Sequence, residues 1–379
     1  MLLVTRICVR ARVSSKCRKY SAIPLLALSS FLVTGRAMAT VIFDDTFGHG
    51  STLITSGSYT APTDGATPSA SSAGYVVASN SAATGAGGST IASGNLNLIT
   101  STKTSNGISE MEAVFTETPV TLSVGGQIDL YVTFQSKAYV MLSGSSTSAA
   151  TFFGIFNSQA SPGYSSTLLP DTNLGSSGLS SSDTNDETGG VQNYIGYVAE
   201  IGFTGNSQGV KVDTRPEQNN SSNTNQDLVT DNAGGSSVSY QNGKAVAPKN
   251  TSDALTLTAD TEYTEDLNID LTATGTETVT TSLYTGGIAD VGVPADRLDS
   301  VSGTATGTNF TTGSFDSLGF GYRNTQNDAG ADMDVNEIEI LSTPAVPEPA
   351  SIGLFAVAGL GFISSRRRSR SSPSTDSAS

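Results

Sequence analysis

The sequence predicts an all-β fold for the central part of the chain, in which two sheets pack as a β-sandwich. Short segments alternate apolar and polar residues, and Gln127–Phe134 places Ile128, Leu130, Val132 and Phe134 on one face of a strand. Stretches rich in Gly, Ser, Thr and Asn separate these segments and supply turns. No long window shows the 3.6-residue apolar stripe that an amphipathic helix would need.

The expected strands follow one another between residues 40 and 343. They cover Val41–Phe47, Gly74–Ala78, Leu96–Thr100, Ile108–Thr116, Val120–Val124, Gln127–Phe134, Ala138–Leu142, Thr151–Asn157, Tyr194–Phe203, Ala254–Thr258, Tyr263–Ala273, Glu277–Tyr284, Phe315–Tyr322 and Met333–Leu341. In the last of these the apolar phase slips at Asn336 and Glu337, which predicts a β-bulge at that point.

Two stretches interrupt the strands and are predicted as long exposed loops. Ser158–Gly190 and Asn206–Asp253 are rich in Ser, Asn, Gly and Asp, and hold too few apolar residues to bury a surface of their own. One of them could instead be a boundary between two domains. A single domain over residues 40–343 is preferred, because the last strands are needed to complete the first sheet.

Charge is distributed unevenly along the chain. Residues 40–343 hold 8 Lys and Arg against 32 Asp and Glu, which gives this domain a formal charge of −24. A surface so acidic repels nucleic-acid backbones, so no nucleic acid is expected as a partner. Both cysteines, Cys8 and Cys17, precede the domain, so a mature chain without them would have neither disulfides nor a thiol nucleophile.

Residues 1–39 have the features of a signal peptide. Basic residues come first, an apolar run follows over Ala22–Gly35, and small residues occupy Ala37 and Ala39, which signal peptidase reads. A retained membrane anchor is the alternative, but the apolar run is short for a span. Export is therefore predicted, with the mature chain beginning at Thr40.

Residues 344–370 combine three elements in order, and residues 371–379 follow as a disordered tail. Pro347, Glu348 and Pro349 form an extended motif that lacks two backbone donors. The apolar run Ala350–Ile363 would measure about 21 Å as a helix, which is short of a hydrocarbon core of about 30 Å. The positive-inside rule places the basic cluster that follows at the cytoplasmic side. This cluster consists of Arg366, Arg367, Arg368 and Arg370.

The three elements resemble the PEP-CTERM sorting signal of Gram-negative bacteria that make extracellular polysaccharide. The resemblance implies that Pro347, Glu348 and Pro349 are recognised as a substrate by an exosortase, a membrane transpeptidase that releases or transfers the protein. Signal peptidase, an exosortase and, transiently, the inner membrane are then the expected partners. An ordinary C-terminal anchor is the alternative, although it would need neither the Pro-Glu-Pro motif nor so short a span.

The central domain resembles concanavalin-like jelly rolls. Three segments show the resemblance. They are Phe153-Gly154-Ile155-Phe156-Asn157, the paired segments within Tyr263–Tyr284, and the segment Phe315–Phe320 before the last strand. It implies a jelly-roll sandwich and raises carbohydrate binding as a hypothesis.

Catalytic residues are not evident. A jelly-roll glycoside hydrolase of this kind would carry acids at the first, third and sixth positions of one strand, but Glu110 and Glu112 are followed by Phe115 at the sixth. The two acids are therefore interpreted as solvated residues on an outward strand face. The chain has no Trp on which a sugar ring could stack, and its single histidine, His49, is interpreted as a turn residue. Tyr194, Tyr197 and Tyr322 are either substitute sugar platforms or core residues.

No cofactor is expected, with calcium as the alternative. Asp328, Asp332 and Asp334 offer carboxylate oxygens close together in the sequence, which calcium prefers, although the spacing of an EF-hand loop is absent. Asp332 and Asp334 fit equally well as outward residues of the last strand.

Together these observations predict an exported, non-catalytic protein of the cell surface or extracellular matrix of a Gram-negative-type bacterium, associated with extracellular polysaccharide. The alternative is a carbohydrate-active enzyme, a glycoside hydrolase or lyase on a jelly-roll scaffold.

Overall fold

The computed structural model describes residues 38–48, 52–54, 74–79, 90–92, 94–99, 107–116, 118–136, 150–158, 194–202, 209–215, 229, 245–247, 255, 257–307, 310, 312–324 and 332–345. The chain divides into two compact units, and all of these residues belong to the unit that spans Ala37–Ala345. The other unit consists of residues 1–36 and 346–379.

One eight-stranded sheet, sheet A, is antiparallel throughout. Its strands lie in the order β15 (Arg297–Thr306), β14 (Thr276–Thr285), β13 (Glu262–Ala273), β8 (Gln127–Ser136), β18 (Asp332–Thr343), β5 (Asn95–Ile99) and β4 (Thr90–Ala92). The first strand of the described chain, β1 (Thr40–Asp45), also pairs with β18. A short 3₁₀ helix, η4 (Ile288–Asp290), lies between β14 and β15.

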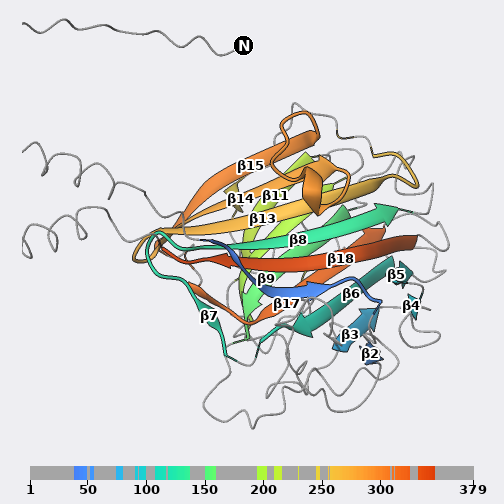
Figure 1. Ribbon diagram of the computed structural model, residues 1–379, viewed down its shortest axis with the longest axis horizontal. Coiled ribbons are helices and arrows are strands. Elements are labelled where there is room, and N and C mark those ends of the chain that lie inside the picture. The colour runs from blue at the N-terminus through green and yellow to red at the C-terminus, as the bar shows by residue number, and fades with distance from the viewer. Residues whose placement is uncertain are drawn as a thin grey trace, which may run out of the picture. The chain divides into compact units, whose positions relative to one another are not determined.

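The second eight-stranded sheet, sheet B, packs against sheet A (Figure 1). Its strands lie in the order β12 (Ala245–Ala247), β11 (Gly209–Arg215), β10 (Ile195–Gly202), β9 (Ala150–Asn157), β17 (Ser317–Asn324), β6 (Gly107–Val114), β3 (Gly74–Ser79) and β2 (Thr52–Ile54). Only β2 and β3 among them pair in parallel. A two-stranded ribbon of β7 (Val120–Thr121) and β16 (Ser314–Phe315) completes the described strands.

The crossovers between the sheets follow a jelly-roll pattern. In sheet A, β8 and β5 flank β18, while in sheet B the strands β9 and β6 flank β17. Strands β8, β18 and β5 of sheet A are therefore matched by their chain neighbours β9, β17 and β6 in the same order in sheet B. This arrangement confirms the predicted two-sheet sandwich.

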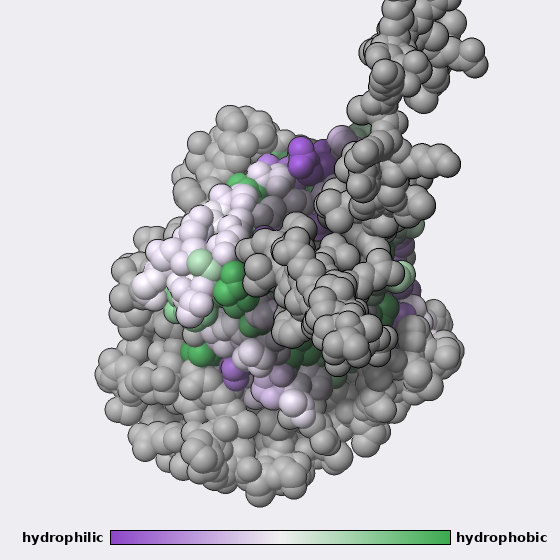
Figure 2. Space-filling view, turned by 60° about the vertical axis from the view of Figure 1, so that its left-hand side comes forward, coloured by the Kyte–Doolittle hydropathy of each residue, from purple (hydrophilic) through white to green (hydrophobic). Residues whose placement is uncertain are grey.

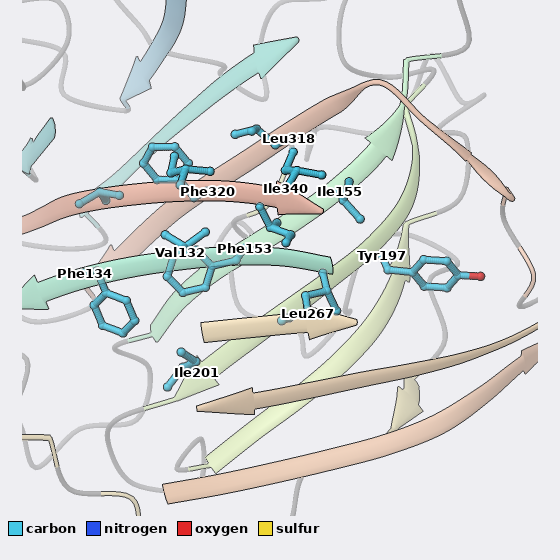
Figure 3. Close-up of a cluster of buried hydrophobic side chains, with 14 of the residues drawn as sticks. Val132, Phe134, Phe153, Ile155, Tyr197, Ile201, Leu267, Leu318, Phe320 and Ile340 are labelled. Carbon is cyan, nitrogen blue, oxygen red and sulfur yellow. The ribbon is translucent and has the colours of Figure 1, made fainter. Parts of the chain in front are cut away.

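The hydrophobic core lies between the two sheets, as Figure 3 shows. Alternate residues of each strand face inward, so Val132 and Phe134 of β8 meet Phe153 and Ile155 of β9. The rings of Phe134 and Phe153 lie with centroids 5.4 Å apart. Burial of such side chains is the main source of stability, at about 25 cal/mol per Å² of apolar surface.

Most of the predicted strands that fall on described residues are present. The bulge is confirmed in β18, because Val335 lies opposite Phe134 and Glu337 opposite Thr133, which leaves Asn336 as the extra residue. The segment predicted as one strand over Phe315–Tyr322 is instead divided at Asp316 into β16 and β17. Ala138–Leu142 and His49 lie outside the described residues.

Three predictions about strands and loops are wrong. Asn206–Asp253 is not a continuous exposed loop, because it contains the buried strand β11 and the short strand β12. The described residues of Ala254–Thr258 form no strand. β15 was not predicted, since Ser, Gly and Thr occupy most of its outward positions and resemble a turn in composition.

Candidate functional site

The residues predicted to direct export lie almost entirely outside the described part of the chain. This holds for Ala37, for Pro347, Glu348 and Pro349, and for the cluster Arg366, Arg367, Arg368 and Arg370. Ala39 is described, and it is exposed directly before Thr40, the first residue of β1. In the described residues there is no helix long and apolar enough to cross a membrane.

The aspartates predicted for calcium are only partly described. Asp328 lies outside the described residues, and Asp332 begins β18. Asp334 is buried, and its carboxylate accepts hydrogen bonds from the side-chain amides of Asn97, at 2.8 Å, and Asn95, at 3.5 Å. Within the described ranges no three acidic, His or Cys side chains are grouped so that they could hold a metal ion. Calcium binding therefore stays a prediction.

The candidate site is the outward face of sheet B, the face turned away from sheet A. Strand alternation places on this face every second residue, and the register of the sheet aligns them in rows. One row contains Glu112, Gly319, Gly154, Val198 and Asp213, and the next contains Glu110, Gly321, Phe152, Glu200 and Lys211. Polar, charged and aromatic side chains therefore share a face that an ordinary solvated sheet would fill with small polar residues.

An ion-paired triad occupies the β10–β11 side of this face. The ammonium of Lys211 lies 2.6 Å from Oε2 of Glu200 and 3.0 Å from Oδ2 of Asp213. Burial alone would lower the pKa of Lys211, but the two carboxylates outweigh it and raise that pKa. Burial also raises the pKa of Asp213, although Lys211 opposes this effect. Lys211 is the most accessible member, with 27% of its side chain exposed.

A second cluster lies beside the triad, around the ring of Phe156. The guanidinium of Arg215 lies 5.9 Å from the centroid of that ring and donates a hydrogen bond to the backbone carbonyl of Tyr194. The rings of Phe156 and Tyr194 lie 6.3 Å apart. Burial, together with the charge and hydrogen bond of Glu112, holds the pKa of Tyr194 well above its ordinary value.

Gly154 lets the Phe156 ring lie flat against the sheet. A Cβ atom at Gly154 would stand 2.4 Å from Cζ of Phe156, so no other residue leaves this space to the ring. Gly196, which lies opposite Phe156 in β10, is equally enclosed, since a Cβ there would stand 2.1 Å from the carbonyl oxygen of Ile155. The segment Phe153-Gly154-Ile155-Phe156 thus places the ring of Phe153 in the core between the sheets and the ring of Phe156 on the outward face of sheet B.

The structure corrects the interpretation of Glu112 and decides between the two alternatives for Tyr197. Glu112 does lie on the outward face, but it is 5% exposed and buried, not solvated. Tyr197 belongs to the core, where its hydroxyl donates a hydrogen bond to Glu277. Phe115 also lies in the core, which agrees with the failure of the three-acid motif.

Sequence reasoning missed the Lys211 triad and Arg215. The alternation of Val210 and Val212 with Lys211, Asp213 and Arg215 was the signal that could have found them, because it marks a strand with one apolar and one charged face. The Ser- and Asn-rich surroundings of this short segment concealed it.

Comparison with known proteins identifies the C-terminal element. Residues 345–368 match the PEP-CTERM protein-sorting motif, so the chain carries this motif and is an exported, cell-envelope-associated protein. The match confirms the predicted resemblance. No curated protein sequence matches the chain.

Solved structures similar to this chain are lectins. Peanut lectin with a nine-residue peptide is 10% identical, with a TM-score of 0.36, over 81% of this chain and 98% of the lectin. Lectin I from Ulex europaeus in complex with the methyl glycoside of α-L-fucose is 13% identical, with a TM-score of 0.35, over 70% and 92%. The carbohydrate recognition domain of Emp47p is 13% identical, with a TM-score of 0.33, over 71% and 89%. At these TM-scores the likeness says nothing about a ligand.

Proposed function

We propose that the protein is a non-catalytic component of the cell surface or extracellular matrix, which its sorting motif delivers and whose β-sandwich associates with extracellular polysaccharide. The outward face of sheet B is the binding surface in this proposal. The observation that carries it is the juxtaposition of Lys211, Glu200 and Asp213 with the aromatic cluster around Phe156 on one sheet face.

The chemistry of this face suits a polyhydroxylated ligand. Carboxylates accept hydrogen bonds from sugar hydroxyls, and ammonium and guanidinium groups donate to them. The rings of Phe156 and Tyr194 are buried, so they support the charged side chains beside them and offer no exposed ring face. Exosortase processing at Pro347, Glu348 and Pro349 would release or transfer the domain to the place where such polymers accumulate.

The test is co-sedimentation of the secreted protein with the polysaccharide of the cells that make it. Lys211→Met should weaken binding by roughly tenfold, the factor that the loss of one charge-assisted contact gives. Arg297→Met is the matched control, because it removes one positive charge from an exposed position on sheet A. Equal binding by both variants would contradict the assignment of the surface. Circular dichroism separates lost binding from lost folding.

The enzyme alternative has one observation in its favour. Glu200 and Asp213 contact the same ammonium, which brings two carboxylates close together, as glycoside hydrolysis requires. Against it, the ammonium of Lys211 bridges the two carboxylates and occupies the position between them. Cleavage of any member of a polysaccharide panel, abolished by Glu200→Gln, would establish the enzyme and remove the non-catalytic proposal.

A further inference from the structure

The exposed charges of the candidate site limit which polysaccharides the outward face of sheet B can bind. Lys211 is the most accessible member of the triad, because 27% of its side chain is exposed, against 10% for Glu200 and 5% for Asp213. Arg215, the other basic residue of β11, is fully buried and donates a hydrogen bond to the backbone carbonyl of Tyr194. Lys211 is therefore the cation that a ligand of the triad meets.

The positive charge of Lys211 is already balanced by its two neighbours. Its ammonium lies 2.6 Å from Glu200 and 3.0 Å from Asp213, so two negative charges surround one positive charge. A ligand carboxylate that approached Lys211 would also approach both of these carboxylates, and two repulsions would oppose one attraction. A hydroxyl group or a ring oxygen is uncharged and meets no such repulsion. The triad therefore disfavours an anionic ligand.

The other basic residues in the described part of the domain lie too far away or on the other sheet. Arg323 occupies a register position on the outward face of sheet B, opposite Ala150, but β9 and β10 separate its strand β17 from β11. Neighbouring strands are about 4.8 Å apart, so three spacings amount to roughly 14 Å, which exceeds the Debye length of about 8 Å. Arg297 belongs to β15 of sheet A, where it lies opposite Tyr284. Neither arginine can support an anion at Lys211.

The chain segments that join the strands of the triad add acids and almost no base. Residues 158–193, between β9 and β10, hold four acids and neither Lys nor Arg, and residues 216–244, between β11 and β12, hold three acids and one Lys. Whatever positions these residues take, they bring more negative than positive charge. Figure 2 shows one side of the domain, where pale residues of intermediate hydropathy predominate over purple, strongly hydrophilic ones. A continuous basic patch, which would be purple, is not seen among the residues coloured in that view.

We infer that the polysaccharide bound by the outward face of sheet B carries no acidic groups. This inference rests on the proposed function and names the class of its ligand, a chain of uncharged sugars. An ammonium has three N–H donors, of which Lys211 directs two at Glu200 and Asp213 and can offer the third to a sugar oxygen. Sugar hydroxyls can in turn donate to the carboxylates. A polymer of uronic acids or sulfated sugars is repelled at the triad and by the acidic domain as a whole.

The test separates the polysaccharide of the producing cells on an anion-exchange resin into an uncharged fraction, which passes through, and an acidic fraction, which is retained. Co-sedimentation then measures the binding of the secreted protein to each fraction. The wild type should bind the uncharged fraction roughly tenfold or more tightly than the acidic one. Raising the salt concentration from roughly 0.05 to 0.5 M should change that binding little, because the ligand forms no ion pair.

Two double variants test whether the triad sets this preference. Glu200→Gln with Asp213→Asn leaves Lys211 charged and removes both repulsions, so it should bind the acidic fraction roughly tenfold more tightly than the wild type does. Glu337→Gln with Glu339→Gln, on the outward side of sheet A, changes the net charge equally and is the matched control, which should gain nothing. Circular dichroism checks that both variants fold.

Each other outcome contradicts a different statement. Wild-type binding to the acidic fraction that equals or exceeds binding to the uncharged one would overturn the inference and leave the proposed function standing. An equal gain by both double variants would show that the overall charge, and not the triad, selects the ligand, which would also overturn it. A wild type that binds neither fraction contradicts the proposed function itself. If the triad variant does not fold, the comparison of the two fractions with the wild type still decides the inference.

Discussion

Glu277 makes the stability of the domain depend on pH. Its side chain is fully buried between the sheets, where Oε2 accepts a hydrogen bond from the hydroxyl of Tyr197. The other oxygen, Oε1, has no hydrogen-bond partner among the described residues. Burial raises the pKa of Glu277 from 4.5 to about 7, although the bond from Tyr197 opposes this effect. The perturbation that we consider is a change of pH across this interval, with Glu277→Gln as the variant that cannot ionise.

Proton binding determines whether the free energy of unfolding rises or falls with pH. Between pH 4.5 and about 7 the folded chain keeps the Glu277 proton that the unfolded chain has lost, so the free energy of unfolding falls as the pH rises. The stabilisation is complete below pH 4.5 and is lost by the time the pH has passed about 7. Each pKa unit corresponds to 1.36 kcal/mol, so this group alone removes about 3 kcal/mol across the interval.

Urea denaturation at several pH values measures the effect, with the free energy of unfolding extrapolated to water. Glu277→Gln keeps an acceptor for Tyr197 and has no charge to bury, so its stability should exceed that of the wild type at pH 8 and approach it at pH 4.5. Burial and the charge of Asp129 raise the pKa of Asp266 to about 7, so part of the slope remains in the variant. Parallel pH profiles for the wild type and Glu277→Gln would refute the reasoning.

Three further predictions follow from the packing, the acidic segment and the tail. Gly196→Ala should destabilise the domain by about 1–3 kcal/mol, because its Cβ would meet the backbone oxygen of Ile155, whereas Gly48→Ala, with no atom nearer than 3.8 Å, should change thermal melting little. If Asp328, Asp332 and Asp334 bind calcium, a chelator should lower the Tm of the wild type and leave the Tm of Asp328→Asn unchanged. A chelator that changes neither Tm would contradict the calcium site. A chain that stops at Ala345 should keep the Tm of the domain, since β18 ends at Thr343, but should leave the membrane fraction for the soluble one. Retention of that shortened chain in membranes would contradict the assigned role of the tail.

Sequence prediction also found strands of sheet B that are buried on both faces, such as β9, but it was most direct for strands with one apolar and one polar face. β8 has this pattern, and so does β18, where even the bulge at Asn336 appears as a change of apolar phase. Such strands lie in sheet A, whose outward side is polar. One row of that side runs through Glu339, Tyr131, Asp266, Ser282 and Ser300. Local alternation was sufficient there because it separates inward apolar residues from outward polar ones, even where an outward residue such as Ser282 is buried.

The site in sheet B could not be predicted in the same way, because its polar residues are buried. Composition identifies Glu112, Glu200 and Asp213 as surface residues, yet each is less than a tenth exposed. What stabilises them is a charged partner, such as Lys211 on the neighbouring strand β11 for Glu200, and local periodicity does not show which side chains lie opposite one another across a strand pair. The sorting motif was predictable for the opposite reason, since a processing enzyme reads it as a linear segment.

Strand β9 is buried on both faces, which distinguishes sheet B from sheet A. Its residues Ala150–Phe156 are all buried, with Phe153 and Ile155 against the core and Phe152 and Phe156 on the outward face. Phe152 and Phe156 belong to a second cluster of buried side chains with Ala150, Tyr194, Val198 and Val229, so protein and not water covers this part of the face. The outward side of sheet A also carries aromatic side chains, Tyr131 of β8 and Tyr284 of β14, and burial together with nearby charges raises the pKa of Tyr131 above its ordinary value. The two outward faces therefore differ in composition: one row of sheet A consists of hydroxyl and carboxylate side chains, whereas sheet B carries a second buried hydrophobic cluster beside the ion-paired triad of Lys211.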